Sequence, residues 1–291
     1  MQSLRRAIDK FVDAAEKDDI ATVVQYVKNG IPINAEGSYG ETALAWAAKN
    51  GSREMVLFLT EHGADKDQED NLGLTPLMLA LKRNHTRILQ FLLGDVNHRD
   101  LQGRTPLHIA QSYEAVRFLV DNGADVNARD EAGRTPLHVL CKNNRPETDA
   151  IRYLLDHGAK VDLKDSDGDT PFLGATLVQK YYYMKVLLSY GADINATDGE
   201  HQTSLFLAAL RNDVPMVKTL LEYGADFTIQ NVDGYTAIQA TDDENIIKLI
   251  EARERQVRKS VSLVARRKGL GPDLEEQVLS YILGGHSRRP F

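Results

Sequence analysis

Histidine and cysteine are the residues of this sequence that could bind a metal or act as a nucleophile. The chain has eight histidines and one cysteine, Cys141. His108 and His138 stand 30 residues apart, whereas a metal pair on one helix needs His-x-x-x-His spacing, and the sequence contains no Cys-x-x-Cys. A single cysteine also excludes an intrachain disulfide framework. We therefore predict no metal site, no cofactor and an inert, buried Cys141.

A run of alternating carboxylates is the second candidate for chemistry. Asp165, Asp167 and Asp169 alternate with serine and glycine, which is how the loop of a calcium site begins. The glutamate that closes an EF-hand loop does not follow, and Gly168-Asp-Thr-Pro171 is typical of a tight turn. The sequence also has no glycine-rich phosphate loop. These residues predict a structural turn, and the chain as a whole is not expected to be an enzyme.

That turn is one copy of a sequence motif that recurs along the chain. Its fullest copies are Thr105-Pro-Leu-His108 and Thr135-Pro-Leu-His138, and each copy has a turn residue in the same slot. These slots are Gly40, Gly73, Gly103, Gly133, Gly168, His201 and Gly234. They lie 33, 30, 30, 35, 33 and 33 residues apart. Together with Gly-Ala-Asp-Val-Asn127, this period resembles the ankyrin repeat over residues 5–252.

The resemblance implies an all-α ankyrin-repeat solenoid of helix-turn-helix pairs with β-turn or hairpin loops. Threonine would cap each first helix, the following proline fits its first turn, and the Gly of Gly-Ala-Asp would end the second helix in the left-handed conformation. One such unit cannot bury its own apolar face, so the units must stack. We expect an N-terminal capping repeat at residues 1–38. About seven repeats should follow at 39–258, the last of them atypical, and then a basic linker and short C-terminal helix at 259–291.

Charge and hydropathy narrow the classes of partner. The net charge is −7, and the segment from Arg253 to Lys268 is strongly basic, which leaves the rest more acidic. That distribution argues against a nucleic-acid-binding solenoid. The sequence has no run of about 18 apolar residues, so we expect no membrane-spanning helix. The N-terminal residues predict an amphipathic helix rather than a signal peptide. We expect a monomeric cytoplasmic protein that binds other proteins.

The resemblance also implies where a partner would bind, because ankyrin stacks use the concave face of turn tips and first helices. The expected contact residues are Tyr39, Leu72, Leu74, Leu101, Arg104, Arg134, Val232 and Tyr235. Arg104 and Arg134 occupy equivalent slots, so their guanidinium groups could form a ladder beside exposed leucines. A protein ligand with apolar anchors and a carboxylate would suit that surface. The alternative is that the turns pack against one another and bind nothing.

The C-terminal segment resembles the opening helix of an F-box. The matching residues that we expect to dock a ligase subunit are Leu270, Pro272, Leu274, Val278, Leu279, Tyr281 and Ile282. Ankyrin effectors of poxviruses and intracellular bacteria carry similarly truncated segments, which recruit a Skp–cullin ubiquitin ligase. Such a protein would act in host cytoplasm or nucleus. The leading hypothesis is therefore a substrate-recruiting adaptor.

Other interpretations stay open for this end of the chain. The helix could only cap the solenoid, with Leu274, Val278 and Leu279 against Ile246 and Ile250, in a plain scaffold or inhibitor. A SOCS-box arrangement could begin at Ser262-Leu263, and Arg266-Arg-Lys268 resembles a short nuclear signal. Earlier in the chain, Asn127 and Asn195 resemble asparagines that a hydroxylase modifies in ankyrin proteins, although closing a turn would explain them equally.

Overall fold

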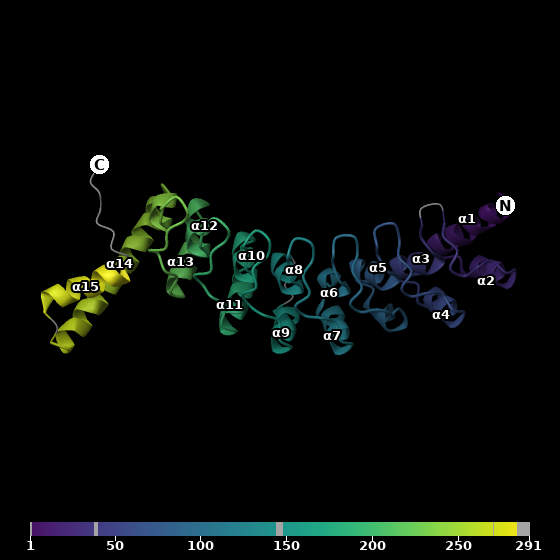
Figure 1. The fold of residues 1–291 in the computed structure, drawn as a ribbon, viewed down its shortest axis with the longest axis horizontal. Helices are drawn as coiled ribbons and strands as arrows, with labels where there is room; N and C mark the ends of the chain where they lie inside the picture. Colours follow the sequence, from purple (N-terminus) through teal and green to yellow (C-terminus); the bar gives the residue numbers. More distant parts are fainter. Residues whose placement is uncertain (1, 38–39, 144–147, 270, 284–291) are drawn as a thin grey trace. The chain divides into compact units, whose positions relative to one another are not determined.

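The computed structural model describes residues 2–37, 40–143, 148–269 and 271–283 (Figure 1). Within them the chain is helical, and extended pairing is limited to an isolated antiparallel bridge between Thr197 and Thr203. The all-α solenoid is therefore confirmed. The chain divides into two compact units, Met1–Lys160 and Val161–Phe291, which we describe separately. No helix in the described ranges has the length and apolar character needed to cross a membrane.

Unit 1 is a stack of two helical layers. One layer contains α1, α3, α5, α6 and α8, each packed on the next, and the other runs through α4, η1, α7 and α9 in the same way. Helix α2 packs on α1. The bounds are α1 Gln2–Glu16, α2 Ile20–Lys28, α3 Ala43–Asn50, α4 Arg53–Glu61, α5 Pro76–Lys82, η1 Thr86–Phe91, α6 Pro106–Ile109, α7 Tyr113–Asp121, α8 Pro136–Lys142 and α9 Thr148–Asp156.

Unit 2 has the same plan until its last helices. First helices α10, α12 and the 3₁₀ helix η2 pack in sequence, and α11 and α13 pack on α10 and α12. Helix α14 packs on α13 with its N-terminal part, and α15 lies beside the more distal part of α14 (Figure 1). The bounds are α10 Pro171–Leu177, α11 Tyr181–Ser189, α12 Ser204–Leu210, α13 Val214–Glu222, η2 Ala237–Ala240, α14 Glu244–Arg267 and α15 Pro272–Ile282.

Local chemistry sets the ends of the repeat helices. The Thr75 hydroxyl accepts a hydrogen bond from the Met78 amide at the start of α5, and Thr170 does the same for Leu173 in α10. Gly123 follows α7 with φ of +89°, a left-handed conformation that glycine adopts without steric cost. The leucine two residues after the capping threonine is buried in successive repeats. In unit 1 these leucines are Leu44, Leu77, Leu107 and Leu137.

One segment differs from its expected structure. Residues 259–267, predicted to be part of a linker, continue α14 as helix. No Gly-Ala-Asp turn interrupts the chain there, and ion pairs spaced i,i+4 join Glu251 to Arg255 and Glu254 to Arg258 along the exposed surface. The helix ends only where Gly269 takes a φ of +65°. The last repeat is therefore extended by an unusually long second helix.

Candidate functional site

The candidate site is built from hydrogen-bonded turn tips in unit 1. In the tip before α6, the Asp100 carboxylate accepts hydrogen bonds from the amides of Gln102 and Arg104, both at 2.9 Å. The Asp100 amide donates to the Arg104 carbonyl at 3.0 Å, and Gly103 between them has φ of +70°. The tip before α8 repeats this bonding at Asp130. Each tip is therefore held in one conformation by its own backbone.

Successive tips also bond to one another. The Leu101 amide donates to the Leu72 carbonyl at 3.3 Å, and the Glu131 amide donates to the Gln102 carbonyl at 3.0 Å. A side chain on Gly73 would bring its Cβ to 2.9 Å from the Leu101 nitrogen, so glycine permits this close approach. Leu72 and Leu101 consequently stand side by side with 59% and 65% of their surface exposed. Two large apolar side chains held in solvent are unusual for a turn.

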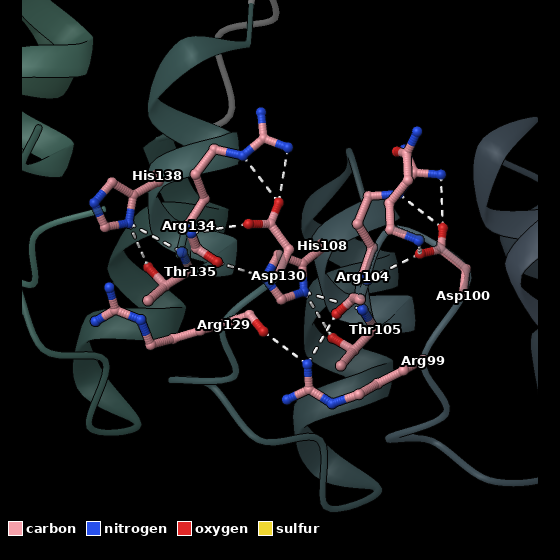
Figure 2. A network of polar contacts seen from close by, with 12 residues as sticks. Arg99, Asp100, Arg104, Thr105, His108, Arg129, Asp130, Arg134, Thr135 and His138 are labelled. Carbon is pink, nitrogen blue, oxygen red and sulfur yellow. Dashed lines mark hydrogen bonds and ion pairs between the residues drawn. The ribbon is translucent and has the colours of Figure 1, made fainter. Parts of the chain in front are cut away.

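The two predicted arginines are bound within their own tips (Figure 2). The Nη2 of Arg104 lies 2.7 Å from a carboxylate oxygen of Asp100, and Arg134 makes the same contact with Asp130. Burial acts to raise the pKa of Asp130, but the hydrogen bonds and charge of Arg134 outweigh it. That pKa therefore lies below its ordinary value of 3.8. Each guanidinium is thus paired with a buried aspartate of its own tip, and the ladder of the two arginines stays a prediction.

The arginines nevertheless keep binding capacity. A guanidinium has five N–H donors, and Asp100 engages only the Nε and Nη2 groups of Arg104. About a third of each arginine side chain is exposed, and Figure 2 shows both guanidinium groups pointing to the same side of the turns. The remaining donors suit a carbonyl or carboxylate of a ligand. We call Leu72, Leu101, Arg104 and Arg134 the turn-tip surface.

His108 holds the repeats together beneath this surface. Its Nδ1 accepts a hydrogen bond from the Thr105 amide at 3.1 Å, so Nε2 carries the proton that it donates to the Arg134 carbonyl at 2.9 Å. Burial lowers the pKa of His108 below its ordinary value of 6.5. The structural interpretation of this histidine is confirmed. Within the described residues, no cluster of three histidine, cysteine or acidic side chains could hold a metal ion.

The last repeat suggests a test of this histidine. Gln239 occupies the same slot and accepts from the Thr236 amide at 2.9 Å, so His108→Gln should keep the cap without a titratable ring. Because the folded-state pKa is depressed, the histidine's contribution to stability is present above about pH 6.5 and is lost as pH falls through the folded value. We expect the free energy of unfolding to decrease less between pH 7 and 5 in the variant than in the natural chain. Urea titrations across that range measure the difference, and superimposable profiles would contradict it.

Comparison with known proteins agrees with this architecture. The sequence profile of "Ankyrin repeats (3 copies)" matches residues 11–70, 62–130 and 112–198, and that of "Ankyrin repeats (many copies)" matches residues 187–239. The chain belongs to the ankyrin-repeat family. The ankyrin repeat domain of Bcl-3, in its crystal structure, has a TM-score of 0.64 and 27% sequence identity, over 73% of this chain and 99% of that one. Ankyrin repeats typically serve as non-enzymatic modules that bind proteins.

Curated ankyrin proteins match only short parts of the chain. A putative ankyrin repeat protein of Acanthamoeba polyphaga mimivirus is 36% identical over 77 residues, covering 26% of this chain and 11% of that protein. The potassium channel AKT3 of Oryza sativa subsp. japonica is 40% identical over 73 residues, covering 25% and 8%. The chain thus spans about a tenth of the length of these relatives. Their similarity concerns the repeat and not the activity of the whole protein.

The other residues expected on the ankyrin concave face differ in their exposure to solvent. Leu74 is 1% exposed, so its prediction as a contact residue is wrong. It occupies the slot of Arg104 and Arg134, directly after the turn glycine, where the long polar side chains of those arginines still reach solvent. In unit 2, Val232 and Tyr235 are 62% and 52% exposed on the last tip. Tyr39 lies outside the described residues.

Sequence reasoning missed the acidic partners of the turn-tip surface. Asp100 and Asp130 each hold a turn and also bind an arginine. The available signal was an aspartate four residues before an arginine in two adjacent repeats. Arg99 was missed as well, although its Nη1 donates to the carbonyls of Gly103 and Arg129 and so bridges the two repeats.

The asparagines with a proposed modification act as connectors between repeats. The side-chain amide of Asn127 donates to the Gly158 carbonyl at 2.9 Å, and its oxygen accepts from the Lys160 amide at 2.9 Å. The Asn195 oxygen accepts from the Asp226 amide at 2.8 Å. These bonds give both residues the turn-closing role considered from the sequence.

Helix α15 leaves most of the predicted ligase-docking side chains in solvent. Leu274, Val278, Tyr281 and Ile282 are 48%, 36%, 90% and 43% exposed. Leu279 is 6% exposed, so its assignment as a docking residue is wrong, because it lies on the side of α15 that packs on α14. Pro272 begins the helix, and Leu270 lies outside the described residues.

The capping interpretation of α15 does not match its position. Its eleven residues span about 16 Å, which carries the helix back along only the distal half of α14. Ile246 and Ile250 are buried at the opposite end of α14, where that helix packs on α13. Leu274 and Val278 therefore do not cover the last repeat as a cap would require.

Proposed function

We propose that this protein is a protein-binding adaptor that holds a target on the turn-tip surface and recruits a Skp–cullin ubiquitin ligase through α15. The observation that supports target binding most strongly is the pair of exposed leucines beside two bound arginines on one hydrogen-bonded ladder. A function of this kind requires access to the cytoplasm or nucleus of a eukaryotic cell.

The rigidity of the turn-tip surface favours binding. Backbone bonds fix each tip before a ligand arrives, so little conformational entropy is lost on association. Leu72 and Leu101 can bury apolar side chains of the target, while the remaining N–H donors of Arg104 and Arg134 can bond its carbonyl or carboxylate oxygens. The expected target segment therefore combines apolar anchors with acceptor groups.

Ligase recruitment is the finer part of the proposal. Its support is the resemblance of residues 270–282 to an F-box opening, together with the solvent exposure of Leu274, Tyr281 and Ile282. An amphipathic helix with apolar side chains in solvent suits a groove on a partner. The alternative is an ankyrin scaffold or inhibitor that binds its target without a ligase.

Paired substitutions separate the two surfaces. Tagged full-length chain, Leu101→Asp and Tyr281→Asp would be incubated with eukaryotic lysate and, separately, with purified Skp-type subunit. Leu4→Asp and Tyr223→Asp are matched controls, since these side chains are 53% and 48% exposed and belong to neither surface. We expect Leu101→Asp to reduce target recovery at least about tenfold and to leave binding of the Skp-type subunit unchanged. Tyr281→Asp should reduce binding of the Skp-type subunit and leave target recovery unchanged.

Each arm has its own decisive result. Equal recovery by Leu101→Asp and Leu4→Asp would show that the turn-tip surface does not hold the target. No binding of purified Skp-type subunit to the unsubstituted chain would remove the ligase proposal and leave the scaffold.

A further inference from the structure

The hairpin of α14 and α15 contains an apolar groove that nothing in the repeat architecture explains. The groove has a volume of about 280 Å³ and lies between the two helices. Its lining consists of Ser260, Val261, Val264, Ala265, Glu275, Val278 and Ile282. The helices pack on each other and run antiparallel, since Glu275 near the start of α15 contacts Ser262 near the end of α14.

The hairpin does not bury all the apolar side chains around the groove. Ala265 and Leu279 are buried at the seam between the helices, and the Ser262 hydroxyl donates to the Glu275 carboxylate across it. Val264 and Ile282 are left 50% and 43% exposed. A two-helix hairpin with this much apolar surface in water is typical of an interface that is covered in the assembled protein.

Charge separates cleanly between the two helices. From Glu251 to Lys268, α14 and its cap carry seven basic residues against two acidic ones, whereas α15 carries three acidic residues and no basic one. The two acids of that α14 segment pair with Arg255 and Arg258 within the helix. Among the described residues, Lys259, Arg266, Arg267 and Lys268 form no ion pair.

This charge pattern selects the occupant. A peptide that carries a single sign of charge would be attracted by one of the two helices and repelled by the other. A second copy of the hairpin can place its α15 against α14 and its α14 against α15. If the like helices lie on the diagonals of a four-helix bundle, every neighbouring pair joins a basic helix to an acidic one.

We infer that a second copy of this chain covers the groove, forming a symmetric dimer through an antiparallel four-helix bundle of two α14–α15 hairpins. A twofold axis makes the contact self-complementary, so Val264 and Val278 of each chain enter the other's groove. The expected monomer is thereby replaced by a dimer.

This inference goes beyond the proposed ligase recruitment and does not rest on it. Both would use Val278 and Ile282, so a dimer must dissociate before α15 can bind another protein. Self-association can be measured on the purified chain alone, which keeps its outcome separate from that of the ligase experiment.

Sedimentation equilibrium of the full-length chain tests the dimer. We expect a mass of twice 32.4 kDa at high concentration, with dissociation on dilution. Val264→Glu places a carboxylate in the apolar seam opposite acidic α15 and should raise the dissociation constant at least about tenfold. Leu263→Glu is the matched control, because Leu263 is 53% exposed on the same helix but does not line the groove. Circular dichroism should show that both variants fold.

The salt dependence of dimerisation provides a second test of the inference. Because the contact joins opposite charges, the dissociation constant should increase severalfold between about 0.05 and about 0.5 M NaCl. A chain of 32.4 kDa at all concentrations would overturn the inference. A dimer equally sensitive to Leu263→Glu and Val264→Glu, or one that tightens with salt, would also overturn it, since the interface would then lie elsewhere or join like charges.

Discussion

Replacing Leu74 by alanine is expected to lower the free energy of unfolding by about 3 kcal/mol. Leu74 is 1% exposed, and truncating a buried leucine loses transfer free energy and leaves a cavity. Its neighbour Leu72 is 59% exposed, so Leu72→Ala should change stability by no more than about 0.5 kcal/mol. Two leucines on either side of Gly73 should thus behave in opposite ways.

Denaturant titration followed by tryptophan fluorescence measures this contrast. The single tryptophan, Trp46, lies in α3, which packs directly on α5. It therefore reports on the part of unit 1 that contains both leucines. Similar midpoints for Leu72→Ala and Leu74→Ala would show that Leu74 is not part of the core. In a target-binding assay the order should be reversed, with Leu72→Ala the more damaging substitution.

Asp130→Ala is expected to destabilise the chain by about 3 kcal/mol, because the hydrogen bonds to its buried carboxylate are lost together. The Asp130 side chain is 1% exposed and binds both the backbone amide and the guanidinium of Arg134. Alanine leaves that amide without its acceptor and Arg134 without its counter-charge. The turn before α8 should then lose its fixed conformation.

Asp130→Asn is the matched variant for this prediction. Asn231 occupies the same slot in the last repeat, where its side-chain oxygen accepts from the amides of Asp233 and Tyr235. Asparagine at 130 should therefore keep the turn and lose only the charged bond, at a cost of about 1 kcal/mol. Urea denaturation of the three chains at pH 7 gives the ranking. Equal destabilisation by alanine and asparagine would mean that the ion pair, rather than the turn bonds, accounts for the whole effect.

Acid denaturation tests the same carboxylate independently. Because the folded-state pKa of Asp130 is depressed, its stabilisation is present above about pH 3.8 and is lost as pH falls through the lower folded value. The difference in stability between the natural chain and Asp130→Asn should consequently narrow as pH falls below 3.8.

The repeat architecture followed from the sequence because its determinants are local. A capping threonine, a left-handed glycine and a leucine two residues after the threonine act within a few residues of one another, and each copy repeats them. The glycine at 123 and the leucine at 107 could therefore be assigned without knowing the neighbouring repeats. The same reasoning gave the buried Cys141, whose thiol pKa is raised by burial, and the interrepeat role of His108.

The orientation of side chains around the turns was decided only by tertiary structure. The leucines at 72 and 74 have the same type and nearly the same position, but the backbone sends one into solvent and the other inward. Arg104 and Arg134 follow the turn glycine as Leu74 does, and the structure pairs them with Asp100 and Asp130.

The C-terminal hairpin shows the same division. Residue pattern alone determined that α15 exists, because an apolar stripe after proline and glycine specifies a short amphipathic helix. The position of α15 depends on where α14 ends, which decides whether α15 covers the last repeat or the distal half of α14. Gly269 sets that end, more than twenty residues after α14 begins. The sequence by itself thus determined the repeats and their helices. The tertiary structure decided which side chains face solvent, because burial depends on neighbours that are distant along the chain.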